Sequence, residues 1–216
     1  SSDLQEVMNY RSALYFALGK MSTISDDSEE GRHKLPLSVR LIKEMHKILL
    51  DNVRGQNKSP GEFKTEQNYI GNSAEITFTP LPPELTQDYM ANFEQYIHFD
   101  EVDLLVQAAL IHCQFEMIHP FKDGNGRIGR LLIPLFLYYR EMLPVPTFYM
   151  SAYFEKDRTM YLEKLSAVSQ KNDYATWIKY FLEGVIQQAE INTLKAKALL
   201  DRYNEFKDIC ISGMSS

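Results

Sequence analysis

The chain has 216 residues, a formal net charge of −6, 44% hydrophobic residues and 24% charged residues. These values are ordinary for a globular protein of one large domain or two small ones, and the negative charge argues against a general nucleic-acid binder, which usually presents a basic surface. The two cysteines, Cys113 and Cys210, form no disulfide framework and no zinc-binding spacing, which fits a reducing, cytoplasmic setting. The longest apolar run, residues 131–139, is too short to cross a bilayer. No signal peptide is visible, and the first residue is Ser, so we expect a fragment of a longer protein.

Apolar residues recur at helical spacing along most of the chain, and no internal repeat interrupts them. Helices are predicted at residues 2–21, 35–53, 83–97, 101–117, 126–142, 157–170, 173–188 and about 190–208.

Residues 55–83 differ, because they are rich in Gly, Pro, Asn and Ser. Two short β-prone pieces, residues 68–70 and 75–79, flank the turn-forming sequence Gly71-Asn72-Ser73. The sequence therefore predicts a single all-α domain over residues 1–216 with a small β-hairpin flap at about residues 66–80.

The most unusual segment is HPFKDGNGRIGR, residues 119–130, which lies between two strongly apolar stretches. Pro120 disfavours a helical conformation for the residue before it, His119. The preceding helix should therefore end near Ile118.

Glycines dominate the second half of this segment. Gly124 and Gly126 permit a tight loop, and Asn125 is a residue type that can cap the helix that follows. The pattern predicts a helix–loop–helix unit at residues 101–142 whose loop presents backbone N–H groups at a helix N-terminus, which is an arrangement that binds anions.

The charged residues of the segment suggest nucleotide chemistry. Arg127 and Arg130 are three residues apart and share a helix face, which favours a polyphosphate over a single carboxylate. Asp123 is an oxygen ligand of the kind that Mg²⁺ takes together with substrate phosphates. His119 is the group that can accept a proton near neutral pH.

Two other motifs can be set aside. The sequence GNGRIG, residues 124–129, matches GxGxxG, but a dinucleotide site needs a strand before it and here a helix is predicted. His112, Glu116 and His119 do not have the HExxH spacing of a zinc protease.

The segment HPFKDGNGRIGR resembles the motif of Fic domains, His-Pro-Phe-x-Asp/Glu-Gly-Asn-Gly-Arg-x-x-Arg, without a departure. The likeness extends over nearly the whole chain. LPLSVRLIKEMHKILL is similar to the helix before the flap, SPGEFKTEQNYIG to the flap segment, with Lys64 where the family often has Arg, and SAYFEKDRTMYLEKL to the segment after the motif helix. The resemblance implies a Fic-type helical bundle with a hairpin flap.

The resemblance also implies an activity. Fic enzymes typically transfer AMP from ATP, with Mg²⁺, to a Ser, Thr or Tyr hydroxyl of a target protein and release pyrophosphate. By similarity, His119 would be the general base, Asp123 would hold Mg²⁺, and Asn125 would stabilise charge at the α-phosphate. Arg127 would bind the β-phosphate and Arg130 the γ-phosphate. The full nucleotide site implied comprises Ile70, Gly71, Asn72, Asp123, Gly124, Asn125, Gly126, Arg127, Ile128, Gly129, Arg130 and Tyr161.

Further expectations concern partners and packing. In the family, the flap pairs with an extended stretch of the target protein, and a homodimer is compatible with the resemblance. Phe121 is expected to anchor the loop in the core, while Tyr161 is either a lining of the adenine pocket or a packing residue. His112 is expected to be a buried core residue. His33, His46 and His98 are interpreted as surface residues.

Many Fic proteins carry an inhibitory helix with the pattern Ser/Thr-x-x-x-Glu-Gly/Asn. Glu30-Gly31 fits its end, but Asp26 stands four residues before the glutamate, so we interpret this match as accidental. Residues 2–21 resemble the segment that follows such a helix. The inhibitory helix is therefore expected upstream, and a nucleic-acid-binding winged-helix domain, if present, downstream.

Two alternatives stay open. The same base and phosphate-binding residues would serve transfer of UMP, GMP or another phosphate-containing group. A nucleotide-binding regulatory or toxin–antitoxin module is the alternative outside enzymology. The target protein, the nucleotide preference, the oligomeric state and the trigger are not encoded in any pattern that we can identify.

Overall fold

The computed structural model describes residues 2–22, 35–53, 57–71 and 76–213. Within these residues the fold is all-α, as predicted from the sequence. Its helices are α1 (Ser2–Ser22), α2 (Val39–Leu49), α3 (Thr86–Ile97), α4 (Leu104–Ile118), α5 (Asn125–Tyr139), α6 (Ser151–Lys156), α7 (Arg158–Lys171) and α8 (Tyr174–Gly213), with a 3-10 turn, η1 (Pro83–Leu85), before α3.

Two helix starts show how local chemistry sets the boundaries. Helix α2 begins four residues later than predicted, because the Ser38 hydroxyl accepts the N–H of Leu41 and caps the helix at that point. Helix α4 begins after Asp103, whose carboxylate accepts the N–H groups of Leu105 and Val106. In both cases the capping side chain determines the residue at which the helix begins.

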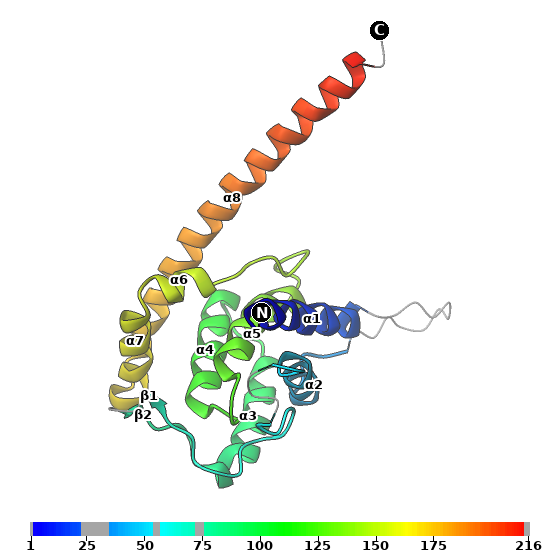
Figure 1. Ribbon diagram of the computed structural model, residues 1–216. Coiled ribbons are helices and arrows are strands. Elements are labelled where there is room, and N and C mark those ends of the chain that lie inside the picture. Colours follow the sequence, from blue (N-terminus) through cyan, green and yellow to red (C-terminus); the bar gives the residue numbers. More distant parts are fainter. Residues whose placement is uncertain (1, 23–34, 54–56, 72–75, 214–216) are drawn as a thin grey trace, which may run out of the picture.

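The prediction of separate helices at 173–188 and 190–208 is wrong, because α8 is continuous. Residues 188–190 are Gln, Ala and Glu, none of which breaks a helix. The first part of α8 packs on the body, whereas the later part extends away from it (Figure 1). Leu194, Leu199 and Tyr203 on this later part are exposed.

Helices α4 and α5 form the centre of the domain, with α1, α2 and α3 on one side and α6, α7 and the first part of α8 on the other (Figure 1). The core contains side chains from the central helices and from both sides, including Phe115 of α4, Phe93 of α3 and Trp177 of α8, all of which are buried. The motif loop between α4 and α5 is therefore held between two packed halves of the domain.

The predicted flap region contains two short strands. Strand β1 (Ile70–Gly71) pairs in antiparallel fashion with β2 (Ile76–Phe78), so that Ile70 lies opposite Phe78. Residues 72–75, which connect them, lie outside the described part of the chain.

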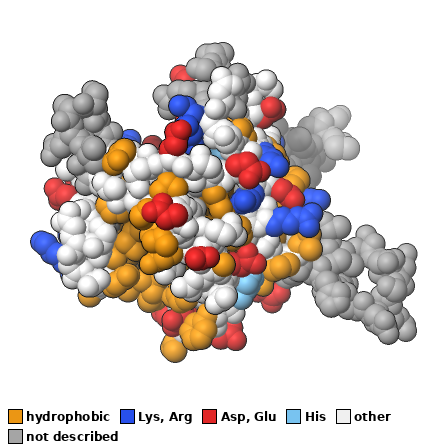
Figure 2. All heavy atoms as spheres, turned by 90° about the horizontal axis from the view of Figure 1, so that it is seen from below, with side chains coloured by type: hydrophobic (Ala, Val, Ile, Leu, Met, Phe, Trp, Pro, Cys, Tyr) orange, Lys and Arg blue, Asp and Glu red, His pale blue; other side chains and the backbone are white. Residues whose placement is uncertain are grey.

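The surface carries mixed charge. On the face shown in Figure 2, acidic and basic side chains are interspersed around a band of hydrophobic side chains, and the described residues form no continuous basic area there. Among the helices that the structure describes, none is both long and apolar enough to span a membrane.

Candidate active site

The motif loop, residues 119–124, has a residue in the left-handed region, with positive φ, at each end. Helix α4 ends at Ile118, as predicted, and His119 follows with φ 49° and ψ 60°. Gly124, with φ 77°, is the N-cap of α5. The prediction that Asn125 caps this helix is wrong by one position, because Asn125 is already the first helical residue and its side chain bonds elsewhere.

Asn125 closes the loop onto itself. Its side chain accepts the N–H of Phe121 at 2.8 Å through Oδ1 and donates to the carbonyl of Phe121 at 2.7 Å through Nδ2. The Phe121 ring is fully buried, which confirms that it anchors the loop in the core. These two bonds make Asn125 a structural clamp between the loop and the first turn of α5.

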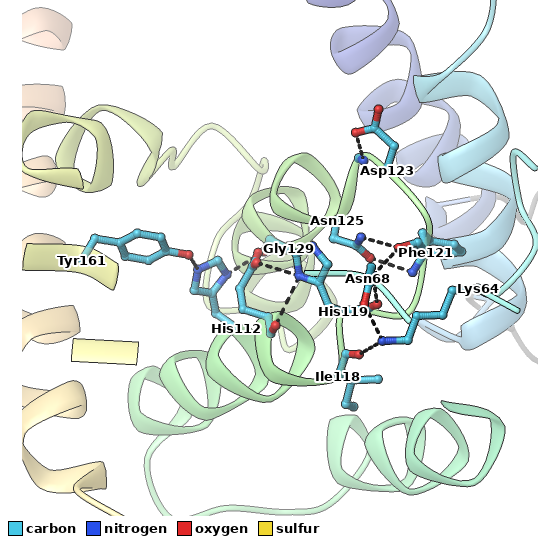
Figure 3. A network of polar contacts seen from close by, with 12 residues as sticks. Lys64, Asn68, His112, Ile118, His119, Phe121, Asp123, Asn125, Gly129 and Tyr161 are labelled. Carbon is cyan, nitrogen blue, oxygen red and sulfur yellow. Dashed lines mark hydrogen bonds and ion pairs between the residues drawn. The ribbon is translucent and has the colours of Figure 1, made fainter. Parts of the chain in front are cut away.

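The carbonyl groups of the loop accept hydrogen bonds from Lys64 and Asn68, which lie on the segment that leads into β1 (Figure 3). The Lys64 ammonium donates to the carbonyl of Ile118 at 3.0 Å, and the Lys64 backbone N–H donates to that of Pro120 at 2.8 Å. The Asn68 amide donates to the carbonyls of His119 and Phe121 at 3.0 and 2.9 Å. Four successive carbonyls are thus fixed, and the backbone of His119 with them.

Lys64 itself is buried, and burial lowers the pKa of its amine to about 8. Its Nζ also donates to Oδ1 of Asn68 at 2.8 Å. A buried ammonium group that donates to a backbone carbonyl and to a side-chain amide supports the loop. The sequence analysis had noted only that Lys64 stands where Fic proteins often have Arg.

His46 contacts the motif loop, which the sequence analysis missed, since we interpreted this residue as exposed. It is fully buried on α2. Its Nδ1 accepts the N–H of Gly61 at 2.7 Å, so Nε2 carries the proton and donates to the carbonyl of Asp123 at 2.9 Å. Its ring stacks on Phe121 with centroids 3.8 Å apart. The only available signal was its helical phase, which puts it one residue after the buried Met45.

The ring of His119 is suited to accept a proton. Its Nδ1 lies 3.3 Å from the carbonyl of Glu116, which can only accept, so Nδ1 carries the hydrogen and Nε2 is left with its lone pair. Burial, with a contribution from the charge of Lys64, lowers the pKa of His119 to about 4. The imidazole is therefore neutral at pH 7.

The N-terminus of α5 lies at the other end of the same loop. The first intrahelical bond runs from Ile128 N to Gly124 O, so the N–H groups of residues 125–127 precede the helical ladder and are available for an anion. Arg127 and Asp123 flank this terminus, with Arg127 Nη2 3.7 Å from Asp123 Oδ1. Arg127 also forms an ion pair at 3.1 Å with Glu6 of α1.

Asp123 can serve as a single carboxylate ligand. Its Oδ1 accepts the N–H of Gly124 at 2.6 Å, and its side chain is 34% exposed. Among the described residues, no group of three or more His, Cys, Asp or Glu side chains is arranged to hold a metal ion. One half-exposed carboxylate suits Mg²⁺, which keeps several waters and takes phosphate oxygens as further ligands.

The comparisons with known proteins agree with this geometry. Residues 36–137 match the sequence model of the Fic/DOC family. This segment is a Fic domain. The chain is 31% identical over 143 residues to protein adenylyltransferase fic-1 of Caenorhabditis briggsae, a match that covers 65% of this chain and 25% of that protein. It is 30% identical over 130 residues to probable protein adenylyltransferase aq_aa38 of Aquifex aeolicus, covering 57% and 39%. The chain thus spans a minor part of the length of these relatives.

Solved structures share the fold. A Fic family protein from Desulfovibrio desulfuricans G20 superposes with a TM-score of 0.73 at 19% identity, over 91% of this chain and 55% of that one. Fic-1 from Caenorhabditis elegans gives a TM-score of 0.66 at 24% identity, over 91% and 53%. At these identities the likeness establishes a Fic fold.

Tyr161 on α7 lies in the packed interior. Its hydroxyl bonds to Nε2 of His112 at 3.0 Å, and Nδ1 of His112 donates to the carbonyl of Gly129 at 2.9 Å (Figure 3). Its ring stacks on Phe154 with centroids 4.7 Å apart. His112 is fully buried, as predicted. This arrangement favours the packing interpretation of Tyr161, and contact with adenine stays a prediction.

Other residues of the predicted nucleotide site lie in the flap or within α5. Ile70 and Gly71 form β1 of the flap, and Asn72 lies outside the described residues. Ile128 is fully buried, and its N–H is used within α5, so it contributes packing. Glu30 also lies outside the described part, so the structure says nothing of the accidental inhibitory match.

Proposed function

We propose that this chain is a protein adenylyltransferase, which transfers AMP from ATP to a Ser, Thr or Tyr hydroxyl of a target protein and releases pyrophosphate. The observation that carries the proposal is the orientation of His119, a neutral imidazole whose Nδ1 is turned to the carbonyl of Glu116 and whose Nε2 keeps its lone pair, on the loop that leads into the N-terminus of α5. A base next to an anion-binding helix terminus is what deprotonation of a hydroxyl for attack on a phosphate requires.

Each motif side chain has a task in this proposal. Nε2 of His119 takes the proton of the attacking hydroxyl. The N–H groups at the start of α5 and the guanidinium groups of Arg127 and Arg130 bind the phosphate oxygens. Asn125, which is committed to Phe121 by two hydrogen bonds, keeps these N–H groups aligned. Most of the catalysis is therefore positioning and charge stabilisation.

Mg²⁺ is the cofactor that we propose, with Asp123 as its protein ligand. When bound, it would neutralise phosphate charge and help to orient the leaving pyrophosphate. The half-exposed carboxylate of Asp123 and its bond to Gly124 N–H support this role.

The target protein would dock at the flap. Strand β1 is only two residues long and is paired with β2 on one side, so an extended peptide that adds to such a strand would bring a hydroxyl toward His119. The association of two copies of the chain is compatible with this arrangement.

Transfer of another nucleotide or phosphate-containing group is the nearest alternative, since the motif residues contact phosphates and little in the motif reads a base. A nucleotide-binding regulatory module is less favoured, because a buried, oriented His119 is unnecessary for binding alone.

The test uses ATP labelled on the α-phosphate and, in parallel, on the γ-phosphate, with Mg²⁺ and a cell lysate as the source of acceptors. Transfer from the α-label only, abolished by His119→Ala, is the expected result. Transfer from the γ-label would replace the proposal with a kinase activity. If neither label is transferred, the same assay with labelled UTP and GTP distinguishes another nucleotide from a binding module.

A further inference from the structure

Glu116 lies in the last turn of α4, and its carboxyl group is buried next to the motif. The side chain is 8% exposed, with Oε2 3.7 Å from Nδ1 of His119. The other oxygen, Oε1, is buried and has no hydrogen-bond partner within the described part of the chain. A buried carboxylate with so few partners is costly, so the position calls for a function that the fold alone does not supply.

Gly129 provides the space for this carboxyl group. A Cβ added at Gly129 would lie 2.3 Å from Oε1 and 3.3 Å from Cδ of Glu116. Gly129 lies within α5 and is not among the described glycines with positive φ. The absence of a side chain, rather than backbone freedom, is therefore what this position requires. The carboxyl group lies against the beginning of α5, since a Cβ at Gly126 would also come within 3.9 Å of Oε1.

The charges around Glu116 come from each neighbouring element. Burial raises the pKa of its carboxyl to about 7, while the charge of Arg130 on α5 lowers it. The other titratable neighbours are Tyr161 on α7 and Cys113 on α4. His119 faces Glu116 through both the backbone carbonyl and the carboxyl group.

The proton transfer creates a charge that this carboxylate can balance. An imidazolium at His119 is disfavoured by burial and by the nearby charge of Lys64. A carboxylate on the Nδ1 side of the ring offsets both effects, because opposite charges a few ångströms apart attract strongly in a buried site.

We propose that Glu116 is a positioning residue that acts through His119: its carboxylate stabilises the imidazolium that forms when Nε2 takes the hydroxyl proton. The proposal rests on the proposed transferase function. In that step the acceptor oxygen bonds to the α-phosphorus, and the bond to pyrophosphate breaks with its electron pair on the leaving oxygen. The proton remains on Nε2 until it passes to solvent, and Glu116, which is a carboxylate above its pKa of about 7, takes up no proton in the step.

The first measurement does not depend on activity. Diethylpyrocarbonate modifies neutral imidazole nitrogen, and its rate at His119 at pH 8, where Glu116 is mainly a carboxylate, reports the basicity of Nε2 when followed by mass spectrometry. Glu116→Gln should slow this modification about threefold, since nucleophilicity follows basicity, with exposed His98 as the internal reference. Gly129→Ala, which displaces the carboxyl group, should act in the same direction. Glu163→Gln, on the exposed face of α7, is the charge-matched control and should change nothing.

The second measurement is the single-turnover rate of α-label transfer. Glu116→Gln should lower it about tenfold while the Kd for Mg-ATP, measured by calorimetry, stays within about twofold. Glu116→Asp, which keeps the charge but withdraws it, should give intermediate values in both measurements. It also replaces Glu116→Gln if circular dichroism shows that variant to be unfolded.

The outcomes are separable. An unchanged modification rate at His119 in both Glu116→Gln and Gly129→Ala would overturn the proposal, as would a large loss of Mg-ATP affinity without slower modification. Slower modification in a protein whose wild type transfers no label would remove the proposed function and leave the link between Glu116 and His119 standing.

Discussion

Two buried histidines brace the motif from opposite sides, and they do so differently. His46 on α2 contacts the loop, where its ring bonds to Asp123 and Gly61 and stacks on Phe121. His112 on α4 contacts the motif helix at Gly129 and continues through Tyr161 into an aromatic cluster (Figure 3). Burial lowers the pKa of each to about 4, so both are neutral connectors.

The difference follows from what each side needs. A loop cannot satisfy its own carbonyl and N–H groups, so its conformation depends on outside partners such as His46. The backbone groups of helix α5 are already hydrogen-bonded within the helix. His112 therefore links α4, α5 and α7 and does not determine the conformation of α5. Loss of His46 should therefore affect the chemistry of the loop, and loss of His112 mainly the stability of the fold.

The largest expected effect is that of His46→Ala. The substitution leaves the buried N–H of Gly61 without its partner and removes the ring on which Phe121 stacks, so it should lower the free energy of unfolding by about 3 kcal/mol. Urea denaturation measures this. His112→Ala is the matched control: we expect a similar loss of stability but a smaller loss of transfer rate. Equal loss of transfer in both variants would contradict the distinction drawn here.

The two hydrogen bonds of His46 can be separated. Gln reaches with its amide to where Nε2 lies and can still donate to Asp123, whereas Asn places an acceptor near Nδ1 and can still take the N–H of Gly61. We expect His46→Gln to retain more transfer activity than His46→Asn at comparable stability. The opposite order would assign the role to the contact with Gly61.

Acid should destabilise the domain through these same residues. Because the pKa of His46 is about 4 in the folded protein and 6.5 in its ordinary range, the unfolded chain takes the proton first. Its stabilising contribution is complete above pH 6.5 and is lost as the pH falls toward 4. Between pH 7 and 5 the loss is about 2 kcal/mol for one such histidine. His46→Gln should show a pH dependence of unfolding that is shallower by that amount. Glu116, whose raised pKa acts with the opposite sign, is common to both proteins and cancels in the difference.

A smaller effect is expected at the far end of the His112 link. Tyr161→Phe removes one buried hydrogen bond and keeps the ring stacked on Phe154, so it should cost about 1 kcal/mol of stability. Mg-ATP affinity should not change if Tyr161 only packs. A drop in affinity beyond about fivefold, roughly 1 kcal/mol, would instead support its predicted place at the adenine.

Much of this architecture could be predicted from the sequence. The all-α class followed from apolar spacing, and the helix–loop–helix unit followed from Pro120 and the glycines, because these residues act on their own backbone. The continuous α8 was missed, since two helices were predicted on either side of residue 189 although no breaking residue stands there.

The supports of the loop were not predictable in the same way. His46, Lys64 and Asn68 act on residues more than fifty positions away in the chain, and no local pattern records such a contact. His46 also has a polar side chain and is followed directly by the exposed Lys47, which favours a surface interpretation. Only the fold reveals that the polar atoms of these residues match the free carbonyls of the motif.

The smallest effect that we predict concerns α1. Oε2 of Glu6 accepts a hydrogen bond from Nη1 of Arg127 at 3.1 Å, and both side chains are partly exposed. A phosphate that binds Arg127 must compete with this ion pair, which is worth about 0.5–1 kcal/mol at such exposure. Glu6→Gln should therefore tighten Mg-ATP binding by about two- to fivefold, measured by calorimetry at low and high salt. The gain should shrink as salt rises, because screening weakens the pair in the wild type. Weaker binding in the variant would mean that Glu6 orients Arg127 for the phosphate instead of competing with it, and α1 would then belong with His46 among the supports of the loop.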